Sequence, residues 1–165
     1  SLPIGPGGGY VTVYGNQGGV IYKGIEAEAT LKLGYGFSLT ANGSINSAAS
    51  KQTGLQIANA PSNTGFAGLL YDRGAFYGSF VTKYVGHRFA GVGQLASGEN
   101  YTRLPRYSSS DLTIGYRWKK NYKFQFQAAN LLDNRTITEG NGSANLTTYY
   151  YLPRRNFYGS FSATF

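Results

Sequence analysis

Few residues of the sequence could perform acid–base or metal chemistry. Glu26 and Glu28 stand two positions apart, so on a strand both carboxylates project from one face about 7 Å apart, a separation that would suit an acid and a base. Carboxylate pairs in glycosidases normally come from different strands, which favours a polar wall instead. His87 is the single histidine, which excludes multi-histidine metal sites and leaves little for a serine hydrolase. We therefore predict no enzyme activity, no catalytic residue, no metal site and no cofactor.

The composition is typical of one all-β domain. The 165 residues include 15 Tyr, 10 Phe, 1 Trp and 24 Gly, and only 13% of them are charged, a mixture rich in strand and turn formers. A membrane-spanning helix needs about 20 consecutive apolar residues, and the sequence has no such run. The net charge of +8 comes from scattered Lys and Arg, so we expect no nucleic-acid partner.

Alternating apolar and polar residues predict about eight antiparallel strands. In the segment "NYKFQFQAANLLDNR", Tyr122, Phe124 and Phe126 alternate with polar neighbours that would lie on the opposite face. Similar alternation indicates that most of the chain is built in this way. The predicted strands cover residues 10–14, 20–33, 37–46, 65–71, 75–84, 111–118, 122–129 and 157–165, and residues 1–9 are expected to form a loop.

The connections between these strands alternate between short and long, and this places every short turn at one end of the sheet. Transmembrane β-barrels have this asymmetry, whereas a soluble meander has no reason for it. The polar faces would also leave a sandwich without a second apolar layer. Trp118 and Tyr122 flank one short turn, as in an aromatic girdle at a membrane interface or a cross-strand pair in a soluble hairpin. The short connections are 34–36, 72–74 and 119–121, and the long ones are 48–62, 90–105 and 133–152.

Three segments together resemble the C-terminal part of TonB-dependent outer-membrane receptors. They are "GVIYKGIEAEATLKL", "NLLDNR" and "LPRRNFYGSFSATF", and they follow one another in the order seen in that family. The matching positions are Gly24 and Glu26 in an early strand, Asn130, Leu131 and Asp133 after the penultimate strand, Pro153 and Arg154 before the last strand, and the terminal Phe165.

This resemblance implies an up-and-down transmembrane barrel of about 22 strands with an N-terminal plug. Residues 1–165 would be the C-terminal barrel segment, the last third, without the plug. The implied function is energised uptake of a scarce nutrient, such as a ferric siderophore, across the bacterial outer membrane. The implied partners are outer-membrane lipid, the missing plug and barrel strands, the TonB energy-coupling protein through the absent N-terminus, and the barrel-assembly machinery, which would read the last strand and Phe165.

Residues of the long connections are the candidates for substrate contact. Tyrosine and arginine offer stacking and charge-assisted hydrogen bonds, which suit an anionic iron chelate. Solvated loop surface is the competing interpretation for each of them. The candidates are Tyr101, Arg103, Arg106, Tyr149 and Tyr151.

The residues also leave two other architectures open. A self-contained eight-stranded outer-membrane barrel with a structural or adhesive role can close around its own side chains, and it requires the strand near Tyr10 to pair with the last strand. A soluble β-sandwich could bind carbohydrate through exposed aromatic rings. The pairing of the first and last strands separates the three hypotheses, because lipid cannot satisfy an open strand edge.

Overall fold

The computed structural model describes residues 2–3, 10–11, 19–52, 54–92, 102–143 and 146–165. Within these ranges the regular elements are all β-strands, which confirms the all-β prediction. None of the described segments forms a helix with the length and apolar character needed to cross a membrane.

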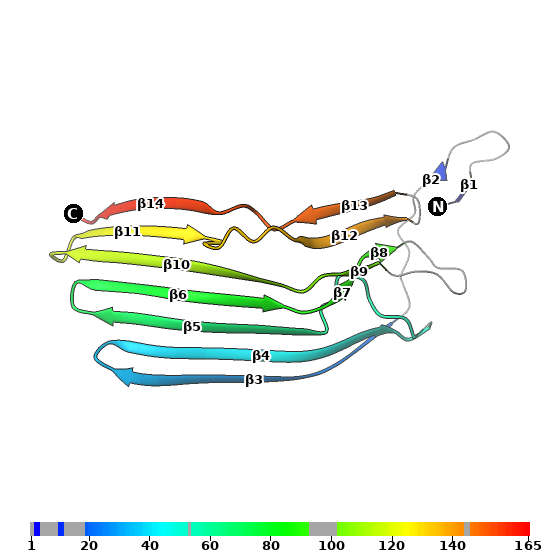
Figure 1. Cartoon of the computed structure of the whole chain (residues 1–165), viewed down its shortest axis with the longest axis horizontal. Helices are drawn as coiled ribbons and strands as arrows, with labels where there is room; N and C mark the ends of the chain where they lie inside the picture. Colours follow the sequence, from blue (N-terminus) through cyan, green and yellow to red (C-terminus); the bar gives the residue numbers. More distant parts are fainter. Residues whose placement is uncertain (1, 4–9, 12–18, 53, 93–101, 144–145) are drawn as a thin grey trace.

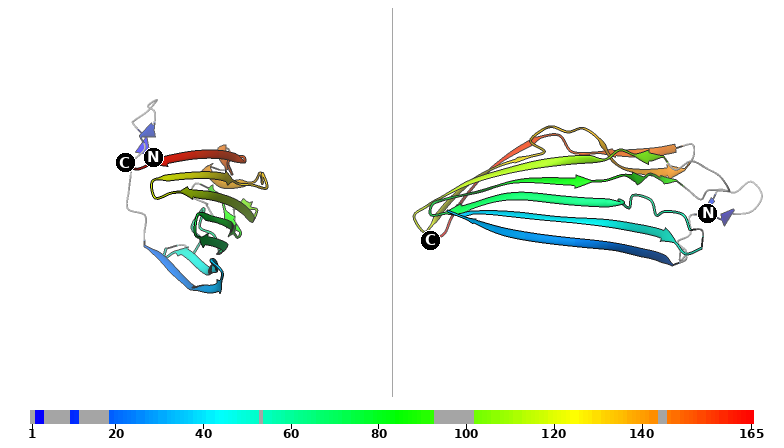
Figure 2. Two further views of the ribbon diagram at one scale, coloured as in Figure 1. Left: turned by 90° about the vertical axis from the view of Figure 1, so that its left-hand side faces the viewer. Right: turned by 60° about the horizontal axis from the view of Figure 1, so that its bottom comes forward.

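Seven long strands form one antiparallel sheet in the order β14-β11-β10-β6-β5-β4-β3. Each strand lies beside the one that precedes or follows it among these seven, so the topology is up-and-down, as predicted. Figure 1 shows the seven ribbons side by side, and Figure 2 shows that the sheet they form is curved. The strands are β3 (Val20–Gly34), β4 (Phe37–Ser50), β5 (Asn63–Arg73), β6 (Phe76–Val85), β10 (Tyr107–Trp118), β11 (Tyr122–Ala129) and β14 (Asn156–Ala163).

The short turns after β3, β5 and β10 all lie at one end of the sheet, on the left in Figure 1, as the spacing predicted. We call this the turn end and the opposite end the loop end. In the first turn, Tyr35 and Gly36 have φ angles of 51° and 88°. A Cβ atom on Gly36 would lie 2.8 Å from the carbonyl oxygen of Asp72, so the approach of the neighbouring turn also requires glycine there.

The loop end differs from the prediction in several places, because strands extend into all three of the predicted long loops or form within them. The strands β4 and β10 extend to Ser50 and back to Tyr107, because backbone pairing continues past the point where apolar residues stop. Part of the segment predicted as the loop 133–152 forms a hairpin, β12 (Ile137–Ser143) and β13 (Leu146–Tyr151), which continues beyond β11 and β14 in Figure 1. Its Gly, Ser and Asn residues concealed this hairpin from a search for alternation.

The two ends of the chain also depart from the prediction. A paired segment, β1 (Leu2–Pro3), lies within the expected loop 1–9 and pairs with β2 (Tyr10–Val11). Tyr10 therefore pairs with Pro3. The eight-stranded barrel required the strand near Tyr10 to pair with the last strand, so this pairing contradicts that hypothesis. Residues 12–14 of the predicted first strand lie outside the described residues. The last strand ends at Ala163, so Phe165 follows the strand instead of belonging to it.

Three further short strands lie at the loop end. β7 (Arg88–Phe89) pairs with β9 (Arg103–Leu104), and β8 (Gly91–Val92) runs parallel to β12. A sandwich needs a second sheet stacked about 10 Å from the first. In the described residues the long strands form one sheet, and the short strands β7, β8, β9, β12 and β13 lie beyond the loop-end limits of β6, β10, β11 and β14 (Figure 1), which contradicts the sandwich hypothesis.

Candidate functional site: the two sheet faces and the loop end

Apolar side chains from all seven strands form one continuous row across the sheet. Leu39 pairs with Leu69, Leu69 with Phe80, and Phe80 with Leu112. Paired positions on neighbouring strands project from the same face, so we call this side of the sheet the apolar face. The complete row is Leu31, Leu39, Leu69, Phe80, Leu112, Ala128 and Phe157.

Most of the large side chains of the apolar face are exposed, whereas the small Ala128 is buried at 1% exposure. Phe124 pairs with Phe161, and the two residues are 43% and 59% exposed. From Leu33 to Ile25, β3 rises about 27 Å, or about 21 Å along a barrel axis tilted by about 40°, close to the apolar band of about 25 Å of membrane barrels. Contact with water over this area would be unfavourable by about 25 cal/mol per Å². The face therefore needs apolar surroundings.

Aromatic pairs gather near the turn end of the apolar face. The ring centroids of Trp118 and Tyr122 are 5.3 Å apart, so the predicted pair is in contact across its turn. Phe37 and Tyr71 form a similar pair at 4.6 Å. Rings with a polar edge beside an apolar band are the arrangement of a membrane-interface girdle.

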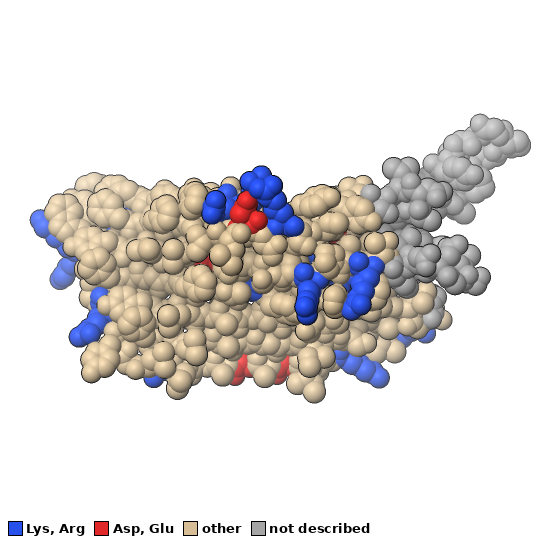
Figure 3. All heavy atoms as spheres, in the orientation of Figure 1, with Lys and Arg blue, Asp and Glu red and all other residues tan. Residues whose placement is uncertain are grey.

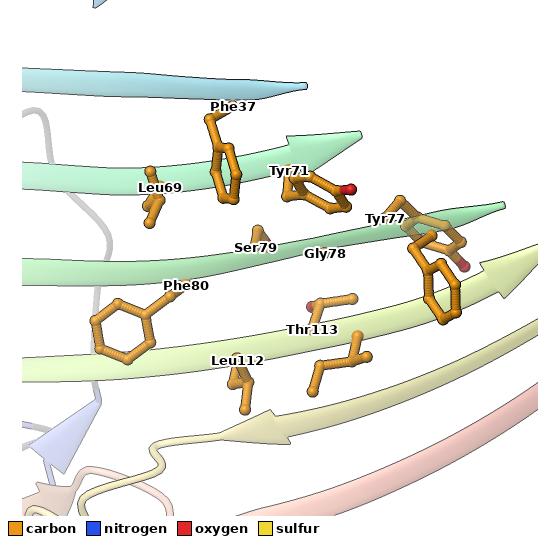
Figure 4. A pocket seen from close by; sticks show the side chains of 11 residues that line it. Phe37, Leu69, Tyr71, Tyr77, Gly78, Ser79, Phe80, Leu112 and Thr113 are labelled. Atoms are coloured by element: carbon orange, nitrogen blue, oxygen red, sulfur yellow. The ribbon is translucent and has the colours of Figure 1, made fainter. Parts of the chain in front are cut away.

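A shallow groove of about 390 Å³ crosses the apolar face at Gly78. Gly78 pairs with Tyr71 on one side and Ile114 on the other. Figure 4 shows Tyr71, Leu69 and Phe80 projecting from neighbouring strands around the glycine. The missing side chain thus leaves a notch in an otherwise continuous apolar surface.

The polar face carries hydrogen bonds between side chains whose strands lie two apart in the sheet, so each bond passes over the strand between them. Arg117 donates from both terminal nitrogens to the two carboxylate oxygens of Asp72, each at 2.8 Å. The hydroxyl of Tyr77 donates to Oε1 of Gln125 at 3.0 Å. Gln125 alternates with Phe124 and Phe126 along β11, and its side chain lies on the other face of the sheet, as predicted. A face of this kind suits the water-filled interior of a barrel.

The motif segment "NLLDNR" forms a tight turn where the chain leaves β11. Asn130 is buried at 4% exposure and has a φ angle of 48°, a left-handed conformation that asparagine tolerates. Its side-chain amide donates to the carbonyl oxygens of Asn134 at 2.9 Å and of Pro153 at 2.8 Å. The turn is therefore attached to the segment that leads into β14, so two of the three segments that carry the family resemblance contact each other.

Asp133 makes the second connection between this turn and the last strand. Its carboxylate accepts hydrogen bonds from the backbone N–H of Arg155 at 3.1 Å and from the guanidinium of Arg154 at 3.1 and 3.2 Å. Arg135 donates to it at 3.1 Å. The Arg155 N–H, followed by the two arginine side chains, holds the pKa of the Asp133 carboxyl below its usual range.

Arg88 joins three segments of the loop end, and the sequence analysis missed it. Its buried guanidinium is 2% exposed and donates to the carbonyl oxygens of Pro105 at 3.1 Å and Ile137 at 2.6 Å, and also to those of Gly86 and Thr138. The ring of Tyr107 lies 5.0 Å from the guanidinium carbon. Burial lowers the pKa of Arg88, but arginine stays protonated at neutral pH. The signal in the sequence was a lone cation within "GHRFAGV".

The structure places four of the five predicted substrate contacts on the segments that Arg88 joins. Arg103 lies on β9 and Arg106 just after it, and both are exposed. Tyr149 and Tyr151 lie on β13, where they pair with Gly140 and Ile137. Arg88 binds β12, and β12 pairs with β13, so these residues lie on segments that meet at one end of the sheet. Tyr101 lies outside the described residues.

The residues weighed for catalysis are not assembled into a reactive group. Glu26 and Glu28 pair with Ser44 and Asn42 on the polar face of β3 and β4. Nδ1 of His87 has no hydrogen-bond partner in the described part of the chain. Within the same part, no group of three or more His, Cys, Asp and Glu residues is close enough to hold a metal ion.

The profile of one protein family, "TonB dependent receptor-like, beta-barrel", matches residues 1–131. A comparison with curated protein sequences gives no match. The family is one of receptors and transporters and not of enzymes.

Several solved structures share the fold. The ferric yersiniabactin uptake receptor FyuA from Yersinia pestis is similar with a TM-score of 0.71 and 19% identity, over 88% of this chain and 24% of that chain. A mutant of the ferric enterobactin receptor PfeA from Pseudomonas aeruginosa is similar with a TM-score of 0.74 and 24% identity, over 88% of this chain and 22% of that chain. The copper transporter OprC is similar with a TM-score of 0.69 and 19% identity, over 88% of this chain and 24% of that chain. The chain thus spans about a quarter of the length of each of these proteins.

Proposed function

Because the chain belongs to the TonB-dependent receptor-like β-barrel family, we propose that it is the C-terminal wall of an outer-membrane receptor that takes up a scarce nutrient, such as a ferric siderophore. The observation that carries this proposal is the apolar face, which runs across all seven strands of the sheet with its large side chains exposed. Lipid is the surrounding that such a face requires, and the polar face would then line the interior of the barrel.

The proposed lipid partner is supported by this arrangement, and the other proposed partners are supported by the family. Outer-membrane lipid covers the apolar face, and a plug and further strands complete the barrel. The TonB protein supplies energy through an N-terminal segment of the receptor, and the barrel-assembly machinery reads the last strand with Phe165. The chain's coverage of about a quarter of each similar structure supports this division of the receptor.

Substrate contact is assigned to the loop end, with Arg103, Arg106, Tyr149 and Tyr151 as its residues. The two arginines are exposed cations, and guanidinium groups bind anionic oxygen ligands through charge-assisted hydrogen bonds. Arg88 orders the segments that carry these residues. A negatively charged iron chelate fits this chemistry, and two of the similar structures are named as ferric-chelate receptors.

Growth and uptake assays test the proposal. A strain that lacks the receptor gene is supplied with ferric siderophores as its only iron source, and radioactive iron uptake is measured after the full-length gene is restored. We expect uptake to return, and we expect the double variant Arg103→Ala/Arg106→Ala to lose about tenfold in apparent affinity.

A matched control changes two cations at the turn end, Lys119→Ala/Lys120→Ala, which lie away from the proposed contact residues. This variant should take up the chelate as the unchanged receptor does. Uptake that is equally reduced by both double variants would contradict the assignment of the loop end. Recovery of the protein in the soluble fraction of the cell would contradict the membrane location.

A further inference from the structure

A group of basic side chains surrounds Asp133 at the loop end of β14. Arg135 and Arg154 bind its carboxylate, and the guanidinium of Arg155 donates to the carbonyl oxygen of Leu131 at 3.3 Å. Three guanidinium groups around one carboxylate leave two positive charges uncompensated. Figure 3 shows basic atoms gathered around acidic atoms near the upper edge of the molecule, with two further basic groups below and to the right of them.

This basic group lies at the border of the apolar face. Arg155 directly precedes β14, and its guanidinium carbon is 5.7 Å from the ring centroid of Phe157. Phe157 in turn stacks on Phe126 at 5.9 Å. The cationic group therefore begins where the apolar row of the last strand ends, which is the position of a lipid headgroup if the apolar face lies in a membrane.

A second groove of the apolar face lies further along the same strand. It has a volume of about 300 Å³, and Gly159 forms part of its wall. A Cβ atom on Gly159 would meet no atom within 4 Å, so the notch is open to the surroundings. Gly159 follows Arg155 by four positions, or about 14 Å along an extended strand. The groove is lined by Phe76, Ile114, Tyr116, Phe124, Phe126 and Gly159, among others.

We propose that this border binds a lipid with a phosphate-bearing headgroup, and that the phosphate lies among Arg135, Arg154 and Arg155. One acyl chain passes Phe157 and enters the groove at Gly159. Arginine matches phosphate because its planar donors bind two oxygens at once. The charge of the group is complementary to the phosphate, and the groove is complementary to the chain. This inference relies on the proposed membrane position of the apolar face, and it adds a specific lipid site to it.

Lipid binding to the full-length protein in detergent tests the site. Phosphatidic acid with acyl chains long enough to reach the groove is titrated and followed by native mass spectrometry, beside the diacylglycerol with the same chains and inorganic phosphate. We expect phosphatidic acid to bind about tenfold more tightly than either component alone, because only the whole lipid uses both the cations and the groove. Equal binding of diacylglycerol would overturn the phosphate site, and equal binding of inorganic phosphate would overturn the lipid site.

Three variants locate the binding. Arg155→Gln removes one cation while its backbone N–H still reaches Asp133, and Gly159→Leu fills the groove; each should weaken binding of phosphatidic acid several-fold. Asp133→Asn removes the competing carboxylate and should preserve or strengthen it. Lys119→Gln/Lys120→Gln changes two charges at the turn end and should leave it unchanged. The proposal would be overturned if the lysine variant lost binding of phosphatidic acid, or if Arg155→Gln bound it as tightly as the unchanged protein does.

The lipid titration and the uptake assay fail in distinguishable ways. A receptor that takes up iron chelates but does not prefer phosphatidic acid would contradict the lipid site alone. A protein that binds phosphatidic acid as expected but takes up no chelate would contradict the proposed substrate alone. Neither measurement depends on the result of the other.

Discussion

The sheet and the loop end of this chain are held together by different interactions. In the sheet, seven strands pair through continuous backbone ladders, and their large side chains pack only against one another along a single exposed face. At the loop end, side chains bind backbone carbonyl groups: Arg88 reaches four carbonyls from three segments, and Asn130 reaches two. Regular pairing therefore organises the wall, and a few buried polar side chains organise the loops.

The difference shows what each region needs from its surroundings. The sheet depends on an apolar solvent, because a water-exposed face of Leu and Phe gains nothing from folding. The loop end carries its own polar partners and would keep its shape in water. Substitutions on the apolar face should therefore act through lipid, and substitutions at the loop end should act through lost hydrogen bonds.

The largest effect should come from a charge placed on the apolar face. Phe80→Arg puts a cation in the central row of that face, and a charge at the bilayer midplane costs about 2–4 kcal/mol in a membrane barrel. Ser79→Arg is the matched control, because Ser79 pairs with Leu70 and Thr113 on the opposite face. Urea unfolding of the full-length protein in lipid vesicles measures both. Equal losses for the two variants would show that the two faces do not differ in their surroundings.

A smaller and more local effect should follow from Arg88→Lys. Lysine keeps the charge but cannot reach four carbonyl groups at once, and each buried group left unpaired costs about 1–3 kcal/mol. The loss should appear as faster hydrogen exchange at the loop end, where the amide of Leu152 binds the carbonyl of Thr136 and that of Ala90 binds Thr102. Exchange in the long strands should not change. Arg106→Lys, at an exposed position, is the control and should alter neither region.

A third prediction concerns the polar face, where one aromatic ring covers a glycine. A Cβ atom on Gly115 would lie 1.9 Å from Cζ of Tyr77, and the cations of Arg117 and Lys123 lie 4.4 and 4.9 Å from the Tyr77 ring centroid. Tyr77→Phe removes the hydrogen bond to Gln125 and the longer one, at 3.5 Å, to the carbonyl oxygen of Phe124, and should cost about 0.5–1.5 kcal/mol. Gly115→Ala must displace the ring and should cost more.

The double variant Gly115→Ala/Tyr77→Phe distinguishes ring displacement from an independent backbone effect. If the alanine acts by moving the ring, the double variant should lose less free energy of unfolding than the sum of the losses in the two single variants, because the displaced ring has already lost its hydrogen bond. Strict additivity would show that Gly115 acts on its own strand. Unfolding in lipid vesicles measures all three variants.

The sequence predicted the sheet well because a strand repeats every two residues. The alternation at Phe124 and Phe126 correctly assigned both faces, and the spacing of the short turns correctly placed them at one end. The sequence also revealed the family motifs, but it did not predict the contacts that their residues make. Asn130 binds the carbonyl of Pro153 only because two distant segments meet in the folded chain. The spacing of residues in the sequence holds no information about that meeting.

The loop end was poorly predicted for the same physical reason. The hairpin of β12 and β13 pairs Gly140 with Tyr149 and Asn141 with Thr148, and such residues show no alternation of apolar and polar side chains that a search of the sequence could detect. Arg88 was missed since a buried arginine without a carboxylate partner has no pattern in sequence. The predicted substrate residues were placed on the correct segments, and their roles stay predictions.

The smallest effect should come from Asp133, whose partners Arg135 and Arg154 have side chains that are 59% and 63% exposed and are therefore screened by water. The Arg155 N–H and the two arginines lower the pKa of Asp133 in the folded protein, so its contribution to stability is full above the usual carboxyl pKa of 3.8 and is lost as the pH falls through the folded value. The melting temperature of Asp133→Asn should thus lie below that of the unchanged protein by a constant amount at neutral and weakly acidic pH, and the difference should shrink in strong acid. Glu139→Gln, an exposed carboxylate of the neighbouring hairpin, controls for the general effect of lost charge. A difference that persists unchanged in strong acid would mean that Asp133 holds the last strand through its shape and not through its charge.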